Sequence, residues 1–325
     1  DDPGPQPMPV MPDAGFAPTC ADLIPFDQEL VIDETSDSMT QIHGAAAFTS
    51  DILWVTYNRP RPDSKFEVYA SAFNCDGSKL FEAMRVTTST TRNDIEPQIM
   101  ALDDRVMILW QSDNSMGPYN LDLWYRIYAP DGTPMTEETR LEMTRKGVQE
   151  SGNAWMPGLC ATDDGFVVAG SWGHSETNRF AVFAQRLDKD GRLIGEAMDA
   201  NLQPDISQVW PSVGCADNGD IRLLWVNSLN GPNGEIETSL ITANSTVAQT
   251  VVFLSGGTGG SAGISPDARL LSYAITVRGE TDIQFFDARD LNTPVSSGAR
   301  GKMDFAPMLV GTSFVHYRKV RGLDN

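Results

Sequence analysis

The sequence is poor in basic residues and has no long hydrophobic stretch. Among its 325 residues are 24 lysines and arginines but 44 aspartates and glutamates, which gives a formal net charge of −20. Because so acidic a surface repels a phosphate backbone, nucleic acid is not an expected partner. No apolar run approaches the ~18 residues that a membrane-spanning helix needs. With 41% hydrophobic residues, the chain is expected to fold as a soluble globular protein.

Cysteine and histidine are also scarce. The chain has three histidines, and its four cysteines are Cys20, Cys75, Cys160 and Cys215. None belongs to a CxxC pair, so a zinc site is not expected. Matching positions in segments 155–161 and 210–216 favour a Cys160–Cys215 disulfide, which leaves Cys20–Cys75 as the second pair; the alternative is buried free thiols. Paired cysteines would indicate an oxidising compartment, such as the periplasm or the cell exterior.

Common catalytic and cofactor motifs are missing as well. The sequence has no Cys–His couple that would supply a nucleophile. Its Gly-x-Ser-x-Gly match, residues 259–263, lies in a glycine-rich segment that is expected to be a flexible connector and not a strand-to-helix turn. The glycine-rich segment 255–263 lacks the Gly-Lys-Ser/Thr of a phosphate-binding loop. Segments 187–191 and 217–220 resemble parts of calcium loops, but they lack the full ligand spacing and coincide with expected turns. We therefore predict no metal or cofactor, with calcium as the alternative.

The chain contains one pattern that recurs along its length, and no sustained helical periodicity. Each unit starts with a short apolar run led by proline or glycine and continues with a second apolar or aromatic run. The lead residues are Gly44, Pro97, Pro157, Pro211, Gly263 and Pro307, at intervals of 53, 60, 54, 52 and 44 residues. In the first four units an Asp-Gly-type turn follows, at Gly77, Gly132, Gly191 and Ser245. Such a long period with four short strands per unit is typical of a β-propeller.

The third unit displays its four strands most clearly. Residues 154–161 and 165–170 form the first two predicted strands, 180–187 alternates as a half-buried third strand, and a fourth begins at Leu193. In the sixth unit only two strands precede the end of the chain, so residues 29–33 are expected to supply an outer strand and close the ring. The predicted fold is an all-β, six-bladed propeller with four-stranded blades.

These repeats resemble those of six-bladed β-propeller proteins of the extracytoplasmic bacterial, lipoprotein-like type. The resemblance covers residues 20–325 and rests on the Pro-apolar, apolar-Trp and Asp-Gly elements. It implies a single propeller domain over these residues and leaves the activity open. The Gly-His and Trp-Asp repeats of WD40 blades and the Ser-x-Asp-x-Gly-x-x-Trp boxes of sialidase-like propellers are absent, so the chemistry of neither family is expected.

Residues 1–19 differ from the rest of the chain in composition. They contain six prolines, three aspartates and no lysine or arginine. Because this segment cannot bury enough apolar surface to fold, we expect a disordered, polyproline-like tether. It resembles the spacer behind the lipid-modified cysteine of a bacterial lipoprotein. A lipid anchor upstream of residue 1 is therefore an option, with an extracytoplasmic location in the periplasm, at the outer membrane or outside the cell.

Aromatic residues recur at similar places in the repeats. Trp54, Trp110 and Trp225 end the second predicted strand of their units, where large side chains are expected to fill the space between blades. Trp155 and Trp210 precede the first strand, where the chain enters the central channel. An aromatic rim there could stack a sugar or another flat ligand, although packing between blades is the alternative. The candidate ligand-binding residues are Trp155, Trp210, Phe305 and His43, together with Trp172 and His174, which are expected on a loop between the second and third strands.

One face of the predicted ring, here called the loop face, carries the connections between the second and third strands and those between successive units. Acidic residues on this face offer a catalytic alternative. Glu96, Asp304 and His43 belong to consecutive units around the predicted ring, and two carboxylates with an imidazole could perform acid–base chemistry. The main interpretation is a non-catalytic recognition or scaffold module that binds a protein or a glycan through its loop face. The alternatives are a lectin-like binder that uses Trp155 and Trp210, and a propeller hydrolase or dehydrogenase with the three acid–base residues at the channel mouth.

Overall fold

The computed structural model describes residues 32, 44–102, 104–113, 121–145, 148–150, 154–174, 179–200, 208–227, 235–244, 247–254, 262–277, 280–297, 308–310 and 313–315. All regular structure in these ranges is β, as predicted, and most of it belongs to five four-stranded antiparallel sheets, numbered here sheets 1 to 5 in chain order. In each sheet the strands are hydrogen-bonded in sequence order, so every sheet is a simple meander.

The strands of the five sheets have the following bounds. Sheet 1 consists of β1 (Gly44–Phe48), β2 (Ile52–Pro60), β3 (Phe66–Asn74) and β4 (Lys79–Arg85). Sheet 2 consists of β5 (Asn93–Leu102), β6 (Arg105–Asp113), β7 (Leu121–Tyr128) and β8 (Thr139–Arg140). Sheet 3 consists of β11 (Ala154–Thr162), β12 (Gly165–His174), β13 (Arg179–Asp188) and β14 (Leu193–Asp199). Sheet 4 consists of β15 (Gln208–Cys215), β16 (Ile221–Asn227), β17 (Glu235–Ile241) and β18 (Val247–Leu254). Sheet 5 consists of β19 (Ala262–Ile264), β20 (Leu270–Val277), β21 (Glu280–Asp287) and β22 (Asp290–Ser297).

Two further pairs of strands complete the described structure. β23 (Met308–Val310) and β24 (Ser313–Val315) form a short antiparallel pair at the positions predicted for the first two strands of the sixth unit. β9 (Met143–Arg145) and β10 (Val148–Glu150) form a second pair between sheets 2 and 3, beside β14. This extra hairpin accounts for the longest repeat interval, the 60 residues from Pro97 to Pro157.

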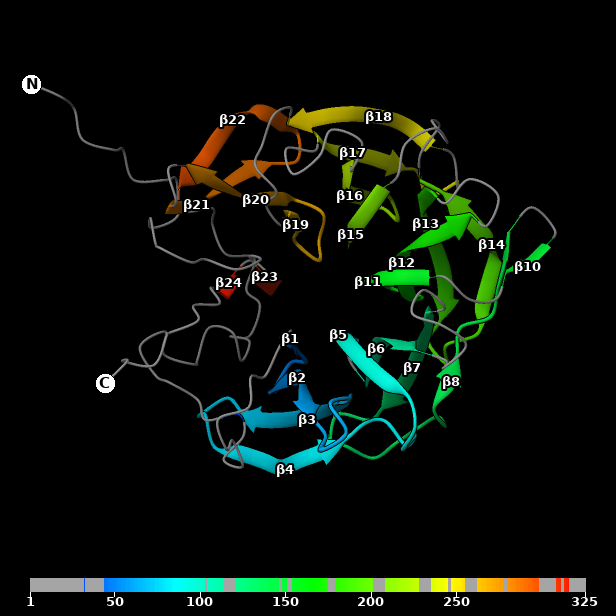
Figure 1. The fold of residues 1–325 in the computed structure, drawn as a ribbon. Helices are drawn as coiled ribbons and strands as arrows, with labels where there is room; N and C mark the ends of the chain where they lie inside the picture. Colours follow the sequence, from blue (N-terminus) through cyan, green and yellow to red (C-terminus); the bar gives the residue numbers. More distant parts are fainter. Residues whose placement is uncertain are drawn as a thin grey trace, which may run out of the picture.

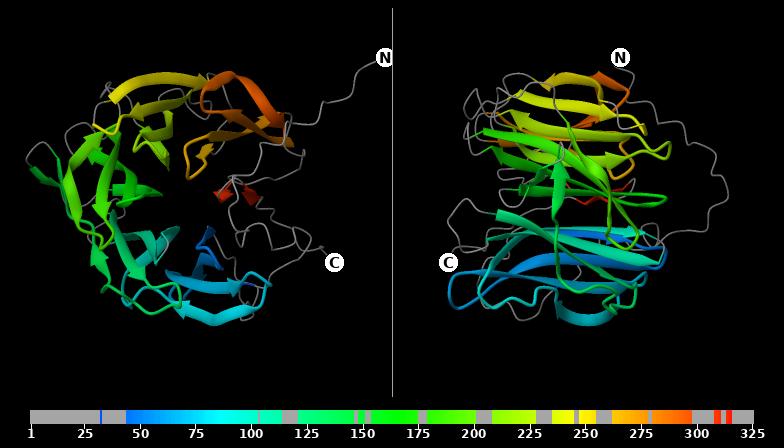
Figure 2. Two further views of the ribbon diagram at one scale, coloured as in Figure 1. Left: turned by 180° about the vertical axis from the view of Figure 1, so that it is seen from behind. Right: turned by 90° about the vertical axis from the view of Figure 1, so that its right-hand side faces the viewer.

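The sheets are arranged around a common centre, with the first strand of each innermost and the fourth at the periphery (Figure 1). Seen from the side, they are stacked around the ring as successive layers (Figure 2). Each innermost strand contacts the next one in the order β1, β5, β11, β15, β19 and β23, and β23 in turn contacts β1. All six contacts join described strands.

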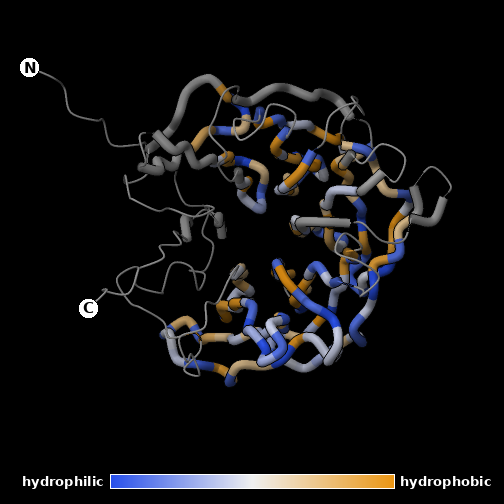
Figure 3. Tube along the Cα trace, viewed as in Figure 1, coloured by the Kyte–Doolittle hydropathy of each residue, from blue (hydrophilic) through white to orange (hydrophobic). Residues whose placement is uncertain are grey.

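Burial is greatest in the two middle strands of a sheet and lowest in the outer strand, as sheets 1 and 2 show. β6 is buried along nearly its whole length, because neighbouring sheets cover both of its faces, whereas the outer strand β4 has no fully buried residue. The apolar positions accordingly concentrate in the inner and middle strands (Figure 3). Each Å² of apolar surface removed from water stabilises a fold by ~25 cal/mol, so this packing between sheets is the main source of stability.

Three tryptophans fill the space between sheets, as predicted. Trp54, Trp110 and Trp225 are all fully buried. The Trp54 ring lies 5.1 Å from that of Phe81 in its own sheet and 5.9 Å from that of Tyr128 in sheet 2, so it joins the two sheets. The prediction that these tryptophans end their strands is wrong, because β2, β6 and β16 all continue beyond them.

The predicted Asp-Gly turns are present at the outer hairpins of the first three sheets. Gly77, Gly132 and Gly191 have φ values of 81°, 91° and 84°, in the left-handed region where a Cβ atom is unfavourable. In each turn the glycine N–H donates to the carbonyl three residues earlier, as from Gly191 to Asp188 over 3.0 Å. The fourth predicted turn residue, Ser245, lies outside the described residues.

A disulfide joins Cys160 in β11 to Cys215 in β15, which is the pairing that the sequence favours. Both cysteines are buried, and their Cα atoms are 5.7 Å apart. The bond therefore links the innermost strands of sheets 3 and 4. Cys75 is disulfide-bonded too; its predicted partner, Cys20, lies outside the described residues. None of the described segments forms a helix long and apolar enough to cross a membrane.

Candidate functional site at the centre of the ring

Three innermost strands share an irregularity, which we call the inner bulge. Pairing with the second strand jumps between Ile95 and Gln98 in β5, between Trp155 and Gly158 in β11, and between Val209 and Ser212 in β15. In all three cases the third residue of the bulge is a proline, which has no N–H to donate to the ladder. The recurring proline of the sequence pattern therefore marks this bulge.

The residue before the proline adopts an unusual backbone conformation in two of the bulges. Glu96 has a φ of 53° and Trp210 a φ of 55°. The other non-glycine residues with positive φ in the described chain, Ser64 and Ala268, lie in turns. A residue before proline prefers extended conformations, and left-handed conformations of this kind cost roughly 1–3 kcal/mol each. The fold therefore holds two chemically distinctive side chains in strained positions on innermost strands.

The first of these side chains is an exposed aromatic ring. Trp210 has 49% of its surface exposed, and it is the only large aromatic residue exposed to this extent in the described structure. An indole that is both solvent-accessible and fixed by its backbone offers a preformed flat apolar face, and stacking on such a face stabilises a bound ring.

The second side chain is a partly buried carboxyl group. Within the described residues, Glu96 has no ion pair or side-chain hydrogen bond, and burial raises the pKa of its carboxyl above the ordinary value of 4.5. Its neighbour Asp94 is fully buried, and burial likewise raises the pKa of that carboxyl; Ser112 donates to it over 2.5 Å. The two acids differ in that only Glu96 remains accessible.

Asn58, in β2 of the preceding sheet, holds the bulge that carries Glu96. Its side-chain amide donates to the main-chain oxygen of Asp94 over 2.9 Å, and its Oδ1 accepts from the main-chain N–H of Glu96 over 3.2 Å. Asn58 could not be recognised from the sequence, because only the pairing between sheets brings it to β5. The shared conformation of Glu96 and Trp210 was not predicted either, although the proline that follows each residue is a visible signal.

The bulge also corrects one predicted equivalence. Counted from the bulge, the residues that match Trp210 are Glu96 and Met156, whereas Trp155 matches Val209 and pairs with Ser171. The aligned cysteines are misleading here, because Cys160 is the third residue after the proline of its bulge, whereas Cys215 is the fourth. Trp155 and Trp210 thus do not hold the same register position.

The remaining predicted site residues fall in several places. Trp172 is not on a loop but within β12, where it is 3% exposed and packs 4.5 Å from the Phe183 ring. It is therefore part of the core between sheets 2 and 3 and does not form an open surface. His174 ends the same strand. His43, Asp304 and Phe305 lie outside the described residues.

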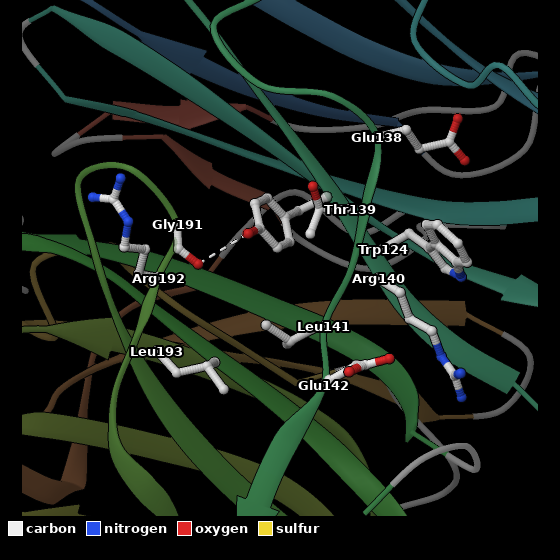
Figure 4. Close-up of a pocket in the computed structure, with 10 residues that line it drawn as sticks. Trp124, Glu138, Thr139, Arg140, Leu141, Glu142, Gly191, Arg192 and Leu193 are labelled. Carbon is white, nitrogen blue, oxygen red and sulfur yellow. Dashed lines mark hydrogen bonds between the residues drawn. The ribbon is translucent and has the colours of Figure 1, made fainter.

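A separate pocket of about 560 Å³ lies at the periphery, between β8 and the β13–β14 hairpin (Figure 4). Its lining includes Trp124, Glu138, Arg140, Glu142, Arg192 and Leu193. Arg140 pairs with Asp122 over 2.8 Å, and the Tyr125 hydroxyl donates to the Gly191 carbonyl over 3.0 Å across the two sheets. The Tyr125 contact joins sheets 2 and 3 at this pocket, and the Arg140 pair holds sheet 2 beside it.

The described residues contain no group of three histidines, cysteines or acids placed to hold a metal ion. At the two turns that resemble calcium loops, the acids take part in local contacts. Asp188 accepts from the main-chain N–H of Asp190 over 2.9 Å, and Asn218 accepts from that of Asp220 over 3.1 Å.

No protein-family model matches the sequence, and no curated protein matches it. Solved structures do resemble the fold. A protein of unknown function from Dyadobacter fermentans aligns over 86% of this chain and 89% of its own, with a TM-score of 0.62 and 11% identity. An α-L-arabinanase from Penicillium chrysogenum, solved with arabinobiose, aligns over 82% and 83%, with a TM-score of 0.51 and 12% identity. TolB from Acinetobacter baumannii aligns over 81% of this chain and 56% of its own, with a TM-score of 0.50 and 11% identity.

The chain has a β-propeller fold. The arabinanase and TolB are themselves propeller proteins, and the described sheets share their radial arrangement. At 11–12% identity the likeness extends to the fold alone. The sheets are accordingly called blades below.

Proposed function

We propose that this protein is an extracytoplasmic binding propeller that recognises a glycan at the centre of its ring, with Trp210 as the stacking surface. The observation that carries the proposal is the combination of 49% exposure and a left-handed backbone at Trp210. Strain of this kind persists where the surrounding structure enforces it, and such positions cluster at ligand sites. An exposed aromatic platform suits the apolar face of a sugar ring.

The proposed architecture has six blades closed by the N-terminal segment. The cyclic contacts from β1 through β23 and back to β1 support this number. A second observation comes from Ile32, whose carbonyl accepts from the Ser71 hydroxyl over 3.2 Å. In blade 2, the Arg126 guanidinium donates in the same way to the carbonyl of Val86, which follows the outer strand of blade 1.

Ser71 and Arg126 occupy equivalent positions. Each pairs with the fourth residue of its second strand, Val55 in β2 and Ile108 in β6. Ile32 therefore lies beside blade 1 in the same position that Val86 takes beside blade 2. This supports the assignment of residues 29–33 to the outer strand of the sixth blade.

We assign the protein to an extracytoplasmic compartment because buried disulfides form and persist in oxidising environments. The Cys160–Cys215 bond and the bonded state of Cys75 support this assignment. In this proposal, a lipid anchor joined to the tether of residues 1–19 would hold the propeller near an envelope surface.

A glycan array tests the proposal directly. We expect the wild-type protein to bind a restricted set of glycans, and the Trp210→Ala variant to lose about tenfold in affinity for them, in line with the loss of one aromatic stacking contact. Leu193→Ala is the matched control, because Leu193 is also an exposed apolar residue but lies at the periphery. If the wild type binds no glycan on the array and captures a protein from envelope extract, the glycan proposal is wrong and the function is protein recognition through the loop face.

A hydrolase is the second candidate, and the carboxyl of Glu96 is the observation that favours it. A partly buried acid whose pKa is raised can serve as a proton donor near neutral pH. In this alternative Asp304 and His43 would complete the site from the neighbouring blades. Release of nitrophenol from aryl glycosides by the wild type, abolished in Glu96→Gln, would establish catalysis, and equal rates in both proteins would remove Glu96 from that role.

A further inference from the structure

The two strained bulges are held in different ways. At the blade 2 bulge, Asn58 is 1% exposed and contacts the main chain on both sides of Ile95, through the Asp94 carbonyl and the Glu96 N–H. The Asp94 side chain is fixed as well, because Ser112 donates to it over 2.5 Å. The backbone that carries Glu96 is therefore fixed by two hydrogen bonds from the neighbouring blade and one side-chain contact within its own.

Within the described residues, no hydrogen bond from blade 3 reaches the main chain of the bulge that carries Trp210. Asn58 is the seventh residue of β2, and the seventh residue of β12 in blade 3 is Ser171, which precedes blade 4 around the ring in the same way. The Ser171 hydroxyl is buried and has no hydrogen-bond partner in the described structure. Of the two strained bulges, only the one with the carboxyl group has this double contact within the described residues.

The fixed carboxyl group is itself left without a partner. No arginine or lysine in the described chain pairs with Glu96, and Arg92, which is close to it in sequence, is paired with Glu138. A group that the structure positions and does not satisfy is available to a ligand. Because the protein carries a formal charge of −20, an anionic ligand would be repelled from this site.

We propose that Asn58 is a positioning residue, which holds the Glu96 carboxyl so that it exchanges hydrogen bonds with the hydroxyls of a neutral, polyhydroxylated ligand. The ligand class rests on the proposed function, whereas the positioning role does not. A carboxyl in this place is suited to hydroxyl groups, since in its protonated form it both donates and accepts. Burial raises the pKa of Glu96, which agrees with such a role.

The positioning role can be tested without any ligand. The pKa of Glu96 would be measured by carbon-13 NMR of the side-chain carboxyls, with Glu96→Gln to assign the resonance. In Asn58→Ala we expect the bulge to relax and the pKa to fall towards the ordinary value of 4.5. Thr56→Ala is the control, because Thr56 is also buried in β2, but its hydroxyl donates to the Tyr69 carbonyl within blade 1 and both Asn58 hydrogen bonds stay in place. An unchanged pKa in a folded Asn58→Ala protein overturns the positioning role.

A second variant keeps the test decisive if Asn58→Ala fails to fold. Asn58→Ser retains a polar group at the position but is too short to reach both main-chain partners. We expect it to shift the pKa of Glu96 in the same direction, and an unchanged value in this variant would overturn the role in the same way.

The ligand class is tested with three disaccharides of different charge, using the change in tryptophan fluorescence as the readout. The probes are arabinobiose, digalacturonic acid and fully deacetylated chitobiose, which are neutral, anionic and cationic. We expect arabinobiose to bind most tightly and Asn58→Ala to weaken its binding by about tenfold, equivalent to one hydrogen bond. Tighter binding of either charged sugar overturns the ligand class. Failure of all three overturns the class together with the proposed function, while the NMR result still decides the role of Asn58.

Discussion

The disulfide between blades 3 and 4 gives the sharpest quantitative prediction. It joins Cys160 and Cys215, which are 55 residues apart in sequence and lie on the innermost strands of neighbouring blades. Cross-linking a loop of this length restricts the unfolded chain, and the loop-entropy relation gives a stabilisation of about 4 kcal/mol at 25 °C. Removing the bond should therefore reduce the free energy of unfolding by a large part of the 5–15 kcal/mol that is typical of folded proteins.

The experiment compares the wild type with the Cys160→Ala, Cys215→Ala double variant by urea denaturation. Alanine avoids a buried unpaired thiol, and the second disulfide remains in all proteins because neither substitution touches Cys75. Each single variant already lacks the bond, so the double variant should be little less stable than either one, which makes the effects strongly non-additive. A loss below about 1 kcal/mol, or simple additivity of the single effects, would refute the loop-entropy reasoning.

Three further predictions follow from the packing and charge of the blades. Gly214→Ala places a Cβ 2.3 Å from a main-chain oxygen of the β19–β20 hairpin. We therefore expect the free energy of unfolding, measured by urea denaturation, to fall by about 1–3 kcal/mol. A change near zero would mean that the blades separate easily. Trp225→Phe should cost more than Trp54→Phe in the same assay, since only the Trp225 indole N–H donates to a carboxylate, that of Glu237 over 3.0 Å; equal costs would contradict this. The raised pKa of Glu96 means that the folded state holds its proton to higher pH, so stability should fall as pH rises from about 4.5 towards the folded-state pKa. Glu96→Gln should flatten that part of the stability profile, and an unchanged slope would show that the carboxyl is not buried.

Much of the fold was predictable because it depends on local patterns. The alternation of residues 180–187 and the turn ending at Gly191 lead to β13 and its hairpin, since strand faces and tight turns are decided by residues close in sequence. Burial was harder to predict at the strand ends. Trp172 follows a short predicted strand and was assigned to a loop, but neighbouring blade 2 covers that end, so pairing with β13 continues to His174.

The candidate site was predictable only in its ingredients. Glu96 and Trp210 were both selected from the sequence, one as an acid and the other as a ring, with no sign that they share a conformation. Their common feature comes from a register shift against the second strand, which cannot be read from one strand alone. Asn58 was missed for the same reason, because its partners lie 36 and 38 residues away in the next blade.

The sequence by itself determined the repeating unit: four short strands, the turns between them and the apolar residues that fill the spaces between blades. These features depend on period-two alternation and on the conformational preferences of glycine and proline, which act over a few residues. Only the tertiary structure decided which side chains stay accessible and which are held under strain. That outcome depends on how one blade packs against the next. The hydrogen bonds that hold the Glu96 bulge come from a different blade, and the exposure of Trp210 likewise depends on the strands around it.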